Sequence, residues 1–244
     1  MGPDMDGFVL AAGEGTRMRP LTADKPKGLV EVAGKPLLTH CFDTLLSVGV
    51  DRLVVVIGYR GDDIVAHYGE QYRDTPIAYV RQDEQLGLAH ALEQARTAVD
   101  GTFVVLNGDN VCRANLDGAI EHHLETDASA TLLVEDVSRA EAKTTGVVTT
   151  DNGGQVTGLV EKPSDPASTL VTRGFFVFEP AIGHACALTR PSERGEYELT
   201  DAIDLLLSAG HRVEAVELEA GVTTSTNRAT STRSRNGSAD GIDR

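Results

Sequence analysis

A glycine-rich segment near the N-terminus and a lysine that follows it combine a flexible backbone with positive charge. Residues 10–17 read Leu-Ala-Ala-Gly-Glu-Gly-Thr-Arg and follow an apolar run. Their small side chains let backbone amides approach an anion closely. Arg17 offers a guanidinium fork and Lys27 a compact ammonium, both suited to phosphate oxygens. The combination predicts a phosphate site, while a plain strand-to-helix turn and solvated surface cations are the alternatives for each feature taken alone.

Two further clusters follow apolar runs later in the chain. Gln82 ends one such run and Gly87 precedes a helical pattern, so the loop between them could clasp a base or simply cap the helix. Asp109 comes directly after the run at residues 103–106, at the sheet edge where α/β proteins bind ligands. A carboxylate there is a magnesium candidate, and the cation would offset phosphate charge. The alternative is an aspartate that caps the next turn.

The elements that must position these residues alternate between strand and helix. Apolar, β-branched runs predict strands at 8–12, 53–59, 77–80 and 103–106, and helical spacing predicts helices at 37–48, 62–72 and 88–99. This alternation indicates a Rossmann-like α/β fold, a mostly parallel sheet with helices on both faces. A smaller antiparallel part is expected from a strand at 130–137, a hairpin at 146–150 and 156–160, and a strand at 174–178. A helix at 197–208 and a strand at 211–218 complete the pattern.

Composition excludes several classes of protein. The net charge is −15 and only five of the 22 basic residues are lysines, which disfavours a nucleic-acid partner and suggests adaptation to high salt. No apolar run reaches membrane-spanning length, so we expect a cytoplasmic protein with no membrane partner. The three cysteines are far apart and should be reduced and buried. His122 and His123 lie on a polar helical stretch and are expected at the surface, and no pattern for a covalent nucleophile is present.

The order of the N-terminal motifs is more specific than any one of them. After Arg17 come Arg19-Pro20-Leu21-Thr22, Pro26-Lys27-Gly28 and Gly34-Lys35-Pro36. In this order the chain resembles the sugar-1-phosphate nucleotidyltransferase family, in particular the haloarchaeal glucose-1-phosphate uridylyltransferases and thymidylyltransferases. The resemblance spans residues 6 to about 219 and implies the nucleotide-diphospho-sugar transferase type of fold. It implies nucleotide contacts from Leu10, Ala11, Ala12, Gly13, Gly15, Thr16, Arg17, Gln82 and Gly87.

The resemblance also implies a metal ligand and a sugar-binding set. Asp109 would bind Mg²⁺, and the sugar-binding residues would be Asn110, Gly146, Glu161, Lys162 and Gly174. In the family the glutamate accepts hydrogen bonds from sugar hydroxyls and the lysine pairs with the sugar phosphate. Thr145 stands where the family commonly has tyrosine, and an exposed ion pair is the alternative for Glu161 and Lys162.

The implied reaction transfers a nucleoside monophosphate from UTP or dTTP to glucose 1-phosphate and releases pyrophosphate. The catalytic residues would be Arg17, Lys27 and Lys162, which position the phosphates and neutralise their charge. The partners would be a nucleoside triphosphate and a sugar 1-phosphate, with homo-oligomerisation left open. A nicotinamide-dependent dehydrogenase is disfavoured because Met18 occupies the position of the third glycine in GxGxxG.

The C-terminal residues depart from the family. Residues 221–244 contain no leucine, phenylalanine or tyrosine and carry four arginines against two aspartates, so residues 220–244 are expected to form a disordered tail after a nucleotidyltransferase domain at 1–219. The family's W-x-D-V segment, with its second magnesium-binding aspartate, is not visible. Assumed codons read in another frame would restore it, which predicts a frameshifted terminus. The alternative function is therefore a catalytically impaired nucleotide-sugar binding or regulatory homologue.

Overall fold

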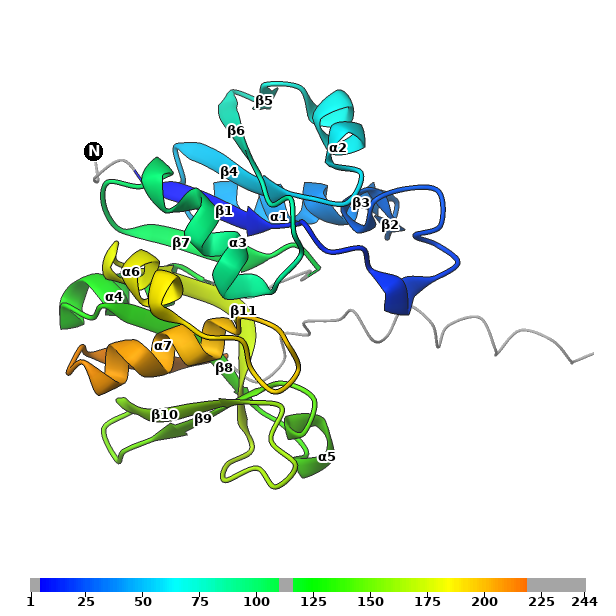
Figure 1. Cartoon of the computed structure of the whole chain (residues 1–244). Coiled ribbons are helices and arrows are strands. Elements are labelled where there is room, and N and C mark those ends of the chain that lie inside the picture. The colour runs from blue at the N-terminus through cyan, green and yellow to red at the C-terminus, as the bar shows by residue number, and fades with distance from the viewer. Residues whose placement is uncertain (1–4, 110–115, 219–244) are drawn as a thin grey trace, which may run out of the picture.

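Strand β1 (Asp6–Leu10) is the central strand of the parallel part of the sheet. The computed structural model describes residues 5–109 and 116–218, apart from the side chain of Arg17. Parallel partners flank β1 on both sides, β4 (Arg52–Ile57) and β7 (Phe103–Asn107), and β4 also pairs in parallel with β6 (Thr75–Arg81). These strands are rich in valine, leucine and isoleucine because both of their faces are covered. Parallel pairing brings their carboxyl ends to one edge of the sheet (Figure 1).

The sheet continues beyond β7 with mostly antiparallel strands. Its order in the described residues is β10-β9-β11-β7-β1-β4-β6-β5, and β8 pairs with β11 and β12. Strand β11 changes register between Thr172 and Phe176, which lets one strand pair with β7, β8 and β9. The strands added here are β5 (Gln71–Tyr72), β8 (Ala130–Asp136), β9 (Gly146–Thr150), β10 (Val156–Glu161), β11 (Leu170–Phe178) and β12 (Val213–Glu217), with a separate hairpin of β2 (Glu31–Val32) and β3 (Lys35–Pro36).

Helices cover both faces of the sheet (Figure 1). Phe8 and Leu10 point into a core with α3, α6 and α7, whereas Val9 points into a second core with α1 and α4. This division follows from the two-residue period of a strand. The helices are α1 (Leu37–Ser47), α2 (Gly61–Tyr68), α3 (Leu88–Ala95), α4 (Asp117–Thr126), α5 (Arg139–Ala142), α6 (Ala181–Leu188) and α7 (Leu199–Ser208), and three short 3₁₀ helices are η1 (Thr16–Met18), η2 (Lys27–Leu29) and η3 (Arg96–Ala98).

The expected alternation of strand and helix is confirmed, with differences at the helix ends. The helix predicted for 62–72 ends at Tyr68, because Gly69 has a φ of 67° and the chain then enters β5. The helix predicted for 88–99 changes to a 3₁₀ turn after Ala95. No helix in the described ranges is long and apolar enough to cross a membrane. Asn110, Cys112 and the tail predicted at 220–244 lie outside the described residues.

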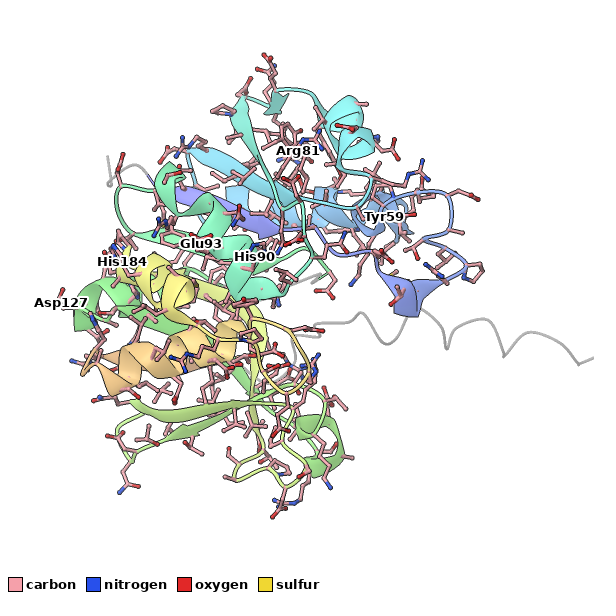
Figure 2. All side chains as sticks on the ribbon, viewed as in Figure 1. Tyr59, Arg81, His90, Glu93, Asp127 and His184 are labelled. Carbon is pink, nitrogen blue, oxygen red and sulfur yellow. The ribbon has the colours of Figure 1, made fainter. Side chains whose placement is uncertain are left out.

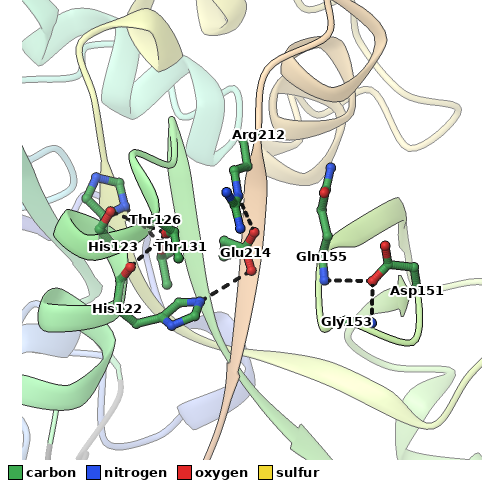
Figure 3. A network of polar contacts seen from close by, with 9 residues as sticks. All are labelled: His122, His123, Thr126, Thr131, Asp151, Gly153, Gln155, Arg212 and Glu214. Atoms are coloured by element: carbon green, nitrogen blue, oxygen red, sulfur yellow. Dashed lines mark hydrogen bonds and ion pairs between the residues drawn. The ribbon is translucent and has the colours of Figure 1, made fainter.

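The expectation of two surface histidines is wrong for His123. Helix α4 packs that side chain against β8, where it is 1% exposed and its Nδ1 lies 2.9 Å from the hydroxyl of Thr131 (Figure 3). Its Nε2 lies 3.4 Å from Glu179. His122 is part-exposed, and its Nε2 lies 3.3 Å from the buried carboxylate of Glu214. A polar helix therefore still has one face that must pack on the sheet.

Burial of His123 gives folding stability a pH dependence. Desolvation lowers the pKa of His123 below its usual 6.5, although Glu179 opposes the shift. As pH falls below about 6.5, the unfolded chain therefore binds a proton that the folded chain resists, and stability decreases. We expect H123N to weaken the pH dependence of the free energy of unfolding between pH 6.5 and 5, measured by denaturant melts in one salt. A slope identical to wild type would contradict this assignment, and melts at pH 8, where the ring is neutral in both states, provide the baseline.

Candidate active site

Three chain segments meet closely at the carboxyl end of β1. The backbone N–H of Gly108 donates to the carbonyl of Leu10 at 3.0 Å, and the N–H of Tyr59 donates to Ala12 at 3.1 Å. A Cβ at Gly108 or at Gly58 would lie 2.7 Å from a carbonyl oxygen of the 10–12 segment, which accounts for glycine at both positions. The glycine-rich loop is therefore held between the ends of β4 and β7.

Within that loop, Gly15 and Lys27 are packed against each other. Gly15 has a φ of 65°, and a Cβ there would lie 2.9 Å from the Cβ of Lys27. The buried hydroxyl of Thr22 donates to the carbonyl of Gly15 at 3.0 Å and fixes the turn. Gly13 is exposed, and a Cβ there would meet no atom within 4 Å. Arg17 lies in η1 immediately after this turn, and its side chain is outside the described atoms.

Lys27 and Asp109 form the charged centre of this edge. Lys27 Nζ donates to Asp109 Oδ2 at 2.6 Å, although 82 positions separate them in the sequence. Their side chains are 21% and 37% exposed, so both remain within reach of a bound ligand. The contact confirms that parallel pairing brings the end of β7 to the loop after β1.

The base-binding candidates Gln82 and Gly87 are in direct contact. Gln82 follows β6 and is 3% exposed, and its Nε2 donates to the carbonyl of Gly87 at 3.1 Å. Gly87 has a φ of 116°, and a Cβ there would lie 2.5 Å from the carbonyl oxygen of Tyr197. A polar hollow of about 160 Å³ lies beside Gln82 at the ends of β4 and β6 (Figure 2 labels Tyr59 and Arg81 of its lining). Its lining is Ile57, Gly58, Tyr59, Arg81, Gln82, Asp83 and Gln85.

Three of the five expected sugar-binding residues lie on β9, on β10 or directly after β10. Gly146 pairs with Glu161 across these strands, and a Cβ on Gly146 would lie 3.2 Å from Glu161 Oε2. Lys162 Nζ lies 2.9 Å from Glu161 Oε1, so the ion pair given as the alternative exists, with both side chains only partly exposed. Gly174, with a φ of 65°, lies at the irregular part of β11. Asn110 lies outside the described residues.

The structure adds Arg194 to this group, a residue that sequence reasoning missed. Its guanidinium lies 3.8 Å from Glu161, 3.2 Å from Glu196 and 2.9 Å from Glu198. The available signal was its position in the polar stretch just before the helix predicted at 197–208. Burial, and then the nearby Glu161 charge, raise the pKa of Glu198, while Arg194 opposes the rise. Lys162 and Arg194 therefore place two cations around the Glu161 carboxylate.

Sheet pairing and loop contacts connect these groups. Phe175 of β11 pairs with Leu106 of β7, so Gly174 lies beside the end of β7 that leads to Asp109. Tyr197 donates its N–H to the carbonyl of Leu86 at 2.7 Å and accepts from Ala89 at 3.0 Å. The loop that bears Arg194 is thus hydrogen-bonded to the loop that bears Gly87.

Asp109 is the expected metal ligand, and its surroundings fit a cation held jointly with phosphate. No group of three His, Cys, Asp or Glu side chains arranged to hold a metal occurs within residues 5–109 and 116–218. Mg²⁺ commonly takes only one or two protein carboxylates and fills its other positions with water and phosphate oxygens. A single part-exposed carboxylate next to a glycine-rich loop is compatible with that pattern.

Comparison with known proteins agrees with this geometry. The chain is 50% identical over 215 residues to the UTP–glucose-1-phosphate uridylyltransferase AglF of Haloferax volcanii, covering 88% of each protein. It is 36% identical to a glucose-1-phosphate thymidylyltransferase of Streptomyces griseus, covering 86% of this chain and 59% of that protein.

Two solved structures share the fold. One is a putative glucose-1-phosphate thymidylyltransferase from Bacillus anthracis, at 26% identity and a TM-score of 0.81, covering 90% of this chain and 89% of that one. The other is a UDP-glucose pyrophosphorylase complexed with UDP-glucose, at 21% identity and a TM-score of 0.80, covering 88% of this chain and 92% of that one. The nucleotidyl transferase family model matches residues 6–221, and the chain belongs to that family.

Proposed function

We propose that this chain transfers the nucleoside monophosphate of UTP or dTTP to glucose 1-phosphate. The observation that carries the proposal is the Lys27–Asp109 contact beside the glycine-rich loop, because it places a cation and a metal-ligand candidate where a triphosphate would meet backbone amides. The 50% identity to a uridylyltransferase over most of both chains supports the choice of substrates. The similarity to a glucose-1-phosphate thymidylyltransferase of Streptomyces griseus supports dTTP as the second candidate.

The chemistry needs no protein nucleophile. An oxygen of the sugar phosphate attacks the α-phosphorus, the bond from that phosphorus to the bridging oxygen breaks, and pyrophosphate leaves with the electron pair. Lys27 and Arg17 would bind and neutralise the triphosphate, and Lys162 with Arg194 would align the attacking phosphate. Mg²⁺ held at Asp109, when bound, supplies further charge neutralisation at the phosphates.

A substrate panel tests the function directly. We expect magnesium-dependent release of pyrophosphate with UTP or dTTP and glucose 1-phosphate, in a panel that also includes ATP, GTP and the 1-phosphates of galactose, mannose and N-acetylglucosamine. A preference for GTP with mannose 1-phosphate would contradict the proposed substrates. Nucleotide binding without pyrophosphate release from any pair would favour the impaired or regulatory homologue instead.

Replacing Lys162 should change the KM for the sugar phosphate but not the KM for the nucleotide. Loss of one ion-paired hydrogen bond to the sugar phosphate should raise the KM for glucose 1-phosphate about 10- to 100-fold in K162A, with little change in the KM for UTP. Steady-state kinetics with each substrate varied in turn measure both. K143A removes an exposed lysine and is the matched control. Equal losses for the two substrates in K162A would argue against this role.

Replacing Asp109 should affect metal use more than stability. D109N removes the charge that Lys27 and Mg²⁺ would share, so we expect kcat to fall about 100-fold or more. The magnesium concentration needed for half-maximal activity should also rise. The melting temperature should change little, because a part-exposed ion pair contributes only about 0 to 1 kcal/mol. An unchanged magnesium dependence would remove Asp109 from the metal site.

A further inference from the structure

The side-chain amide of Gln82 is held in one orientation. Gln82 is almost fully buried at the carboxyl end of β6, where its backbone N–H donates to Ile57 at 2.8 Å. Its side-chain Nε2 lies 3.1 Å from the carbonyl oxygen of Gly87 and 2.9 Å from Nδ1 of His90. A carbonyl oxygen can only accept, so the NH₂ end of the amide must face Gly87.

His90 is matched to that orientation. Because the NH₂ end of Gln82 donates, Nδ1 of His90 carries the lone pair and its ring proton lies on Nε2. The side-chain Nε2 of the exposed Gln94 lies 3.3 Å from that Nε2, so this tautomer requires the Gln94 amide to turn its oxygen toward the ring. The ring is placed by α3, whose first turn hydrogen-bonds to Tyr197 through Ala89 N–H, and its centroid lies 6.1 Å from that of Tyr197. Both amide hydrogens of Gln82 are therefore used, one on Gly87 and one on His90.

This arrangement leaves Gln82 Oε1 as an acceptor. Among the described residues it makes no hydrogen bond, and Gln82 lines the polar hollow of about 160 Å³ at the ends of β4 and β6. If the amide turned over, Oε1 would face the Gly87 carbonyl oxygen, and that contact would be repulsive whichever ring nitrogen of His90 carries the proton. The Gly87 carbonyl thus determines which end of the amide a ligand meets, and His90 Nδ1, as acceptor of the second amide hydrogen, holds the amide in that orientation.

We propose that His90 is a positioning residue that determines base specificity, by holding Gln82 so that its Oε1 meets ring position 3 of a pyrimidine nucleotide. The proposal rests on the proposed function and on the expectation from the sequence that Gln82 contacts the base. Uracil and thymine carry an N–H at position 3, which Oε1 accepts. Cytosine carries a lone pair there, which Oε1 repels. An acceptor left facing an acceptor is unfavourable, so the enzyme selects UTP and dTTP against CTP.

Two substitutions at His90 form a matched pair. In H90N the amide oxygen can occupy the position of Nδ1 and accept from Gln82, whereas H90L offers no acceptor. We expect H90L to lower kcat/KM for UTP about tenfold, as for the loss of one well-oriented hydrogen bond, and to reduce the preference for UTP over CTP by a similar factor. H90N should keep most of the preference. The KM for glucose 1-phosphate should not change in either variant.

The measurements are steady-state kinetics with UTP and CTP, and calorimetric binding of both nucleotides with Mg²⁺ in the absence of sugar phosphate. Melting curves establish that both variants are folded. An unchanged ratio of UTP to CTP in H90L overturns the proposal, and so does an equal loss in H90N and H90L, because the acceptor would then be irrelevant. If wild type binds UTP over CTP yet releases no pyrophosphate, the proposed function fails while the role of His90 is still tested by the binding ratio.

Discussion

The parallel pairing of β1 with both β4 and β7 is the constraint on which the site depends. Parallel neighbours end at the same edge, so the turns after these strands must share a small space. Here they share it through backbone contacts, and Gly58 and Gly108 have no room for a Cβ against the segment that follows β1. The position of Lys27 relative to Asp109 is then a consequence of strand pairing rather than of local sequence.

Charge poses a second problem, because a chain with a net charge of −15 must bind two anionic phosphate groups. The cations proposed to bind these phosphates, as far as their side chains are described, are each paired with a carboxylate: Lys27 with Asp109, Lys162 with Glu161, and Arg194 with Glu198. The pairs of Lys27 and Lys162 are partly exposed, so water weakens them and exchange of the carboxylate for a phosphate costs little, whereas Glu198, the partner of Arg194, is buried. The carboxylates that are released could then bind a metal ion or sugar hydroxyls.

Sequence reasoning located the long strands and the loops after them, because buried parallel strands are continuous apolar runs and their ends carry glycine and polar residues, but it did not predict the two-residue strands β2, β3 and β5. It did not locate α6, whose small and apolar residues show little helical contrast because Ile182 and Cys186 are buried between other helices. It misplaced His123, since nothing in a polar helix shows which face packs on the sheet. Arg194 was missed because its importance arises from contact with Glu161, 33 positions earlier and on another element.

The contact between Gly87 and Tyr197 joins the loop expected to bind the base to the loop that bears Arg194. Leu86 and Ala89 hydrogen-bond to Tyr197 on either side of Gly87, and a Cβ on Gly87 would lie only 2.5 Å from the Tyr197 carbonyl oxygen. The base-side loop therefore cannot shift without displacing the loop that bears Arg194, which in turn contacts Glu161. Because closely packed groups move together, the loop that Gln82 contacts is linked to the loop that bears Arg194 through the backbone contacts at Tyr197.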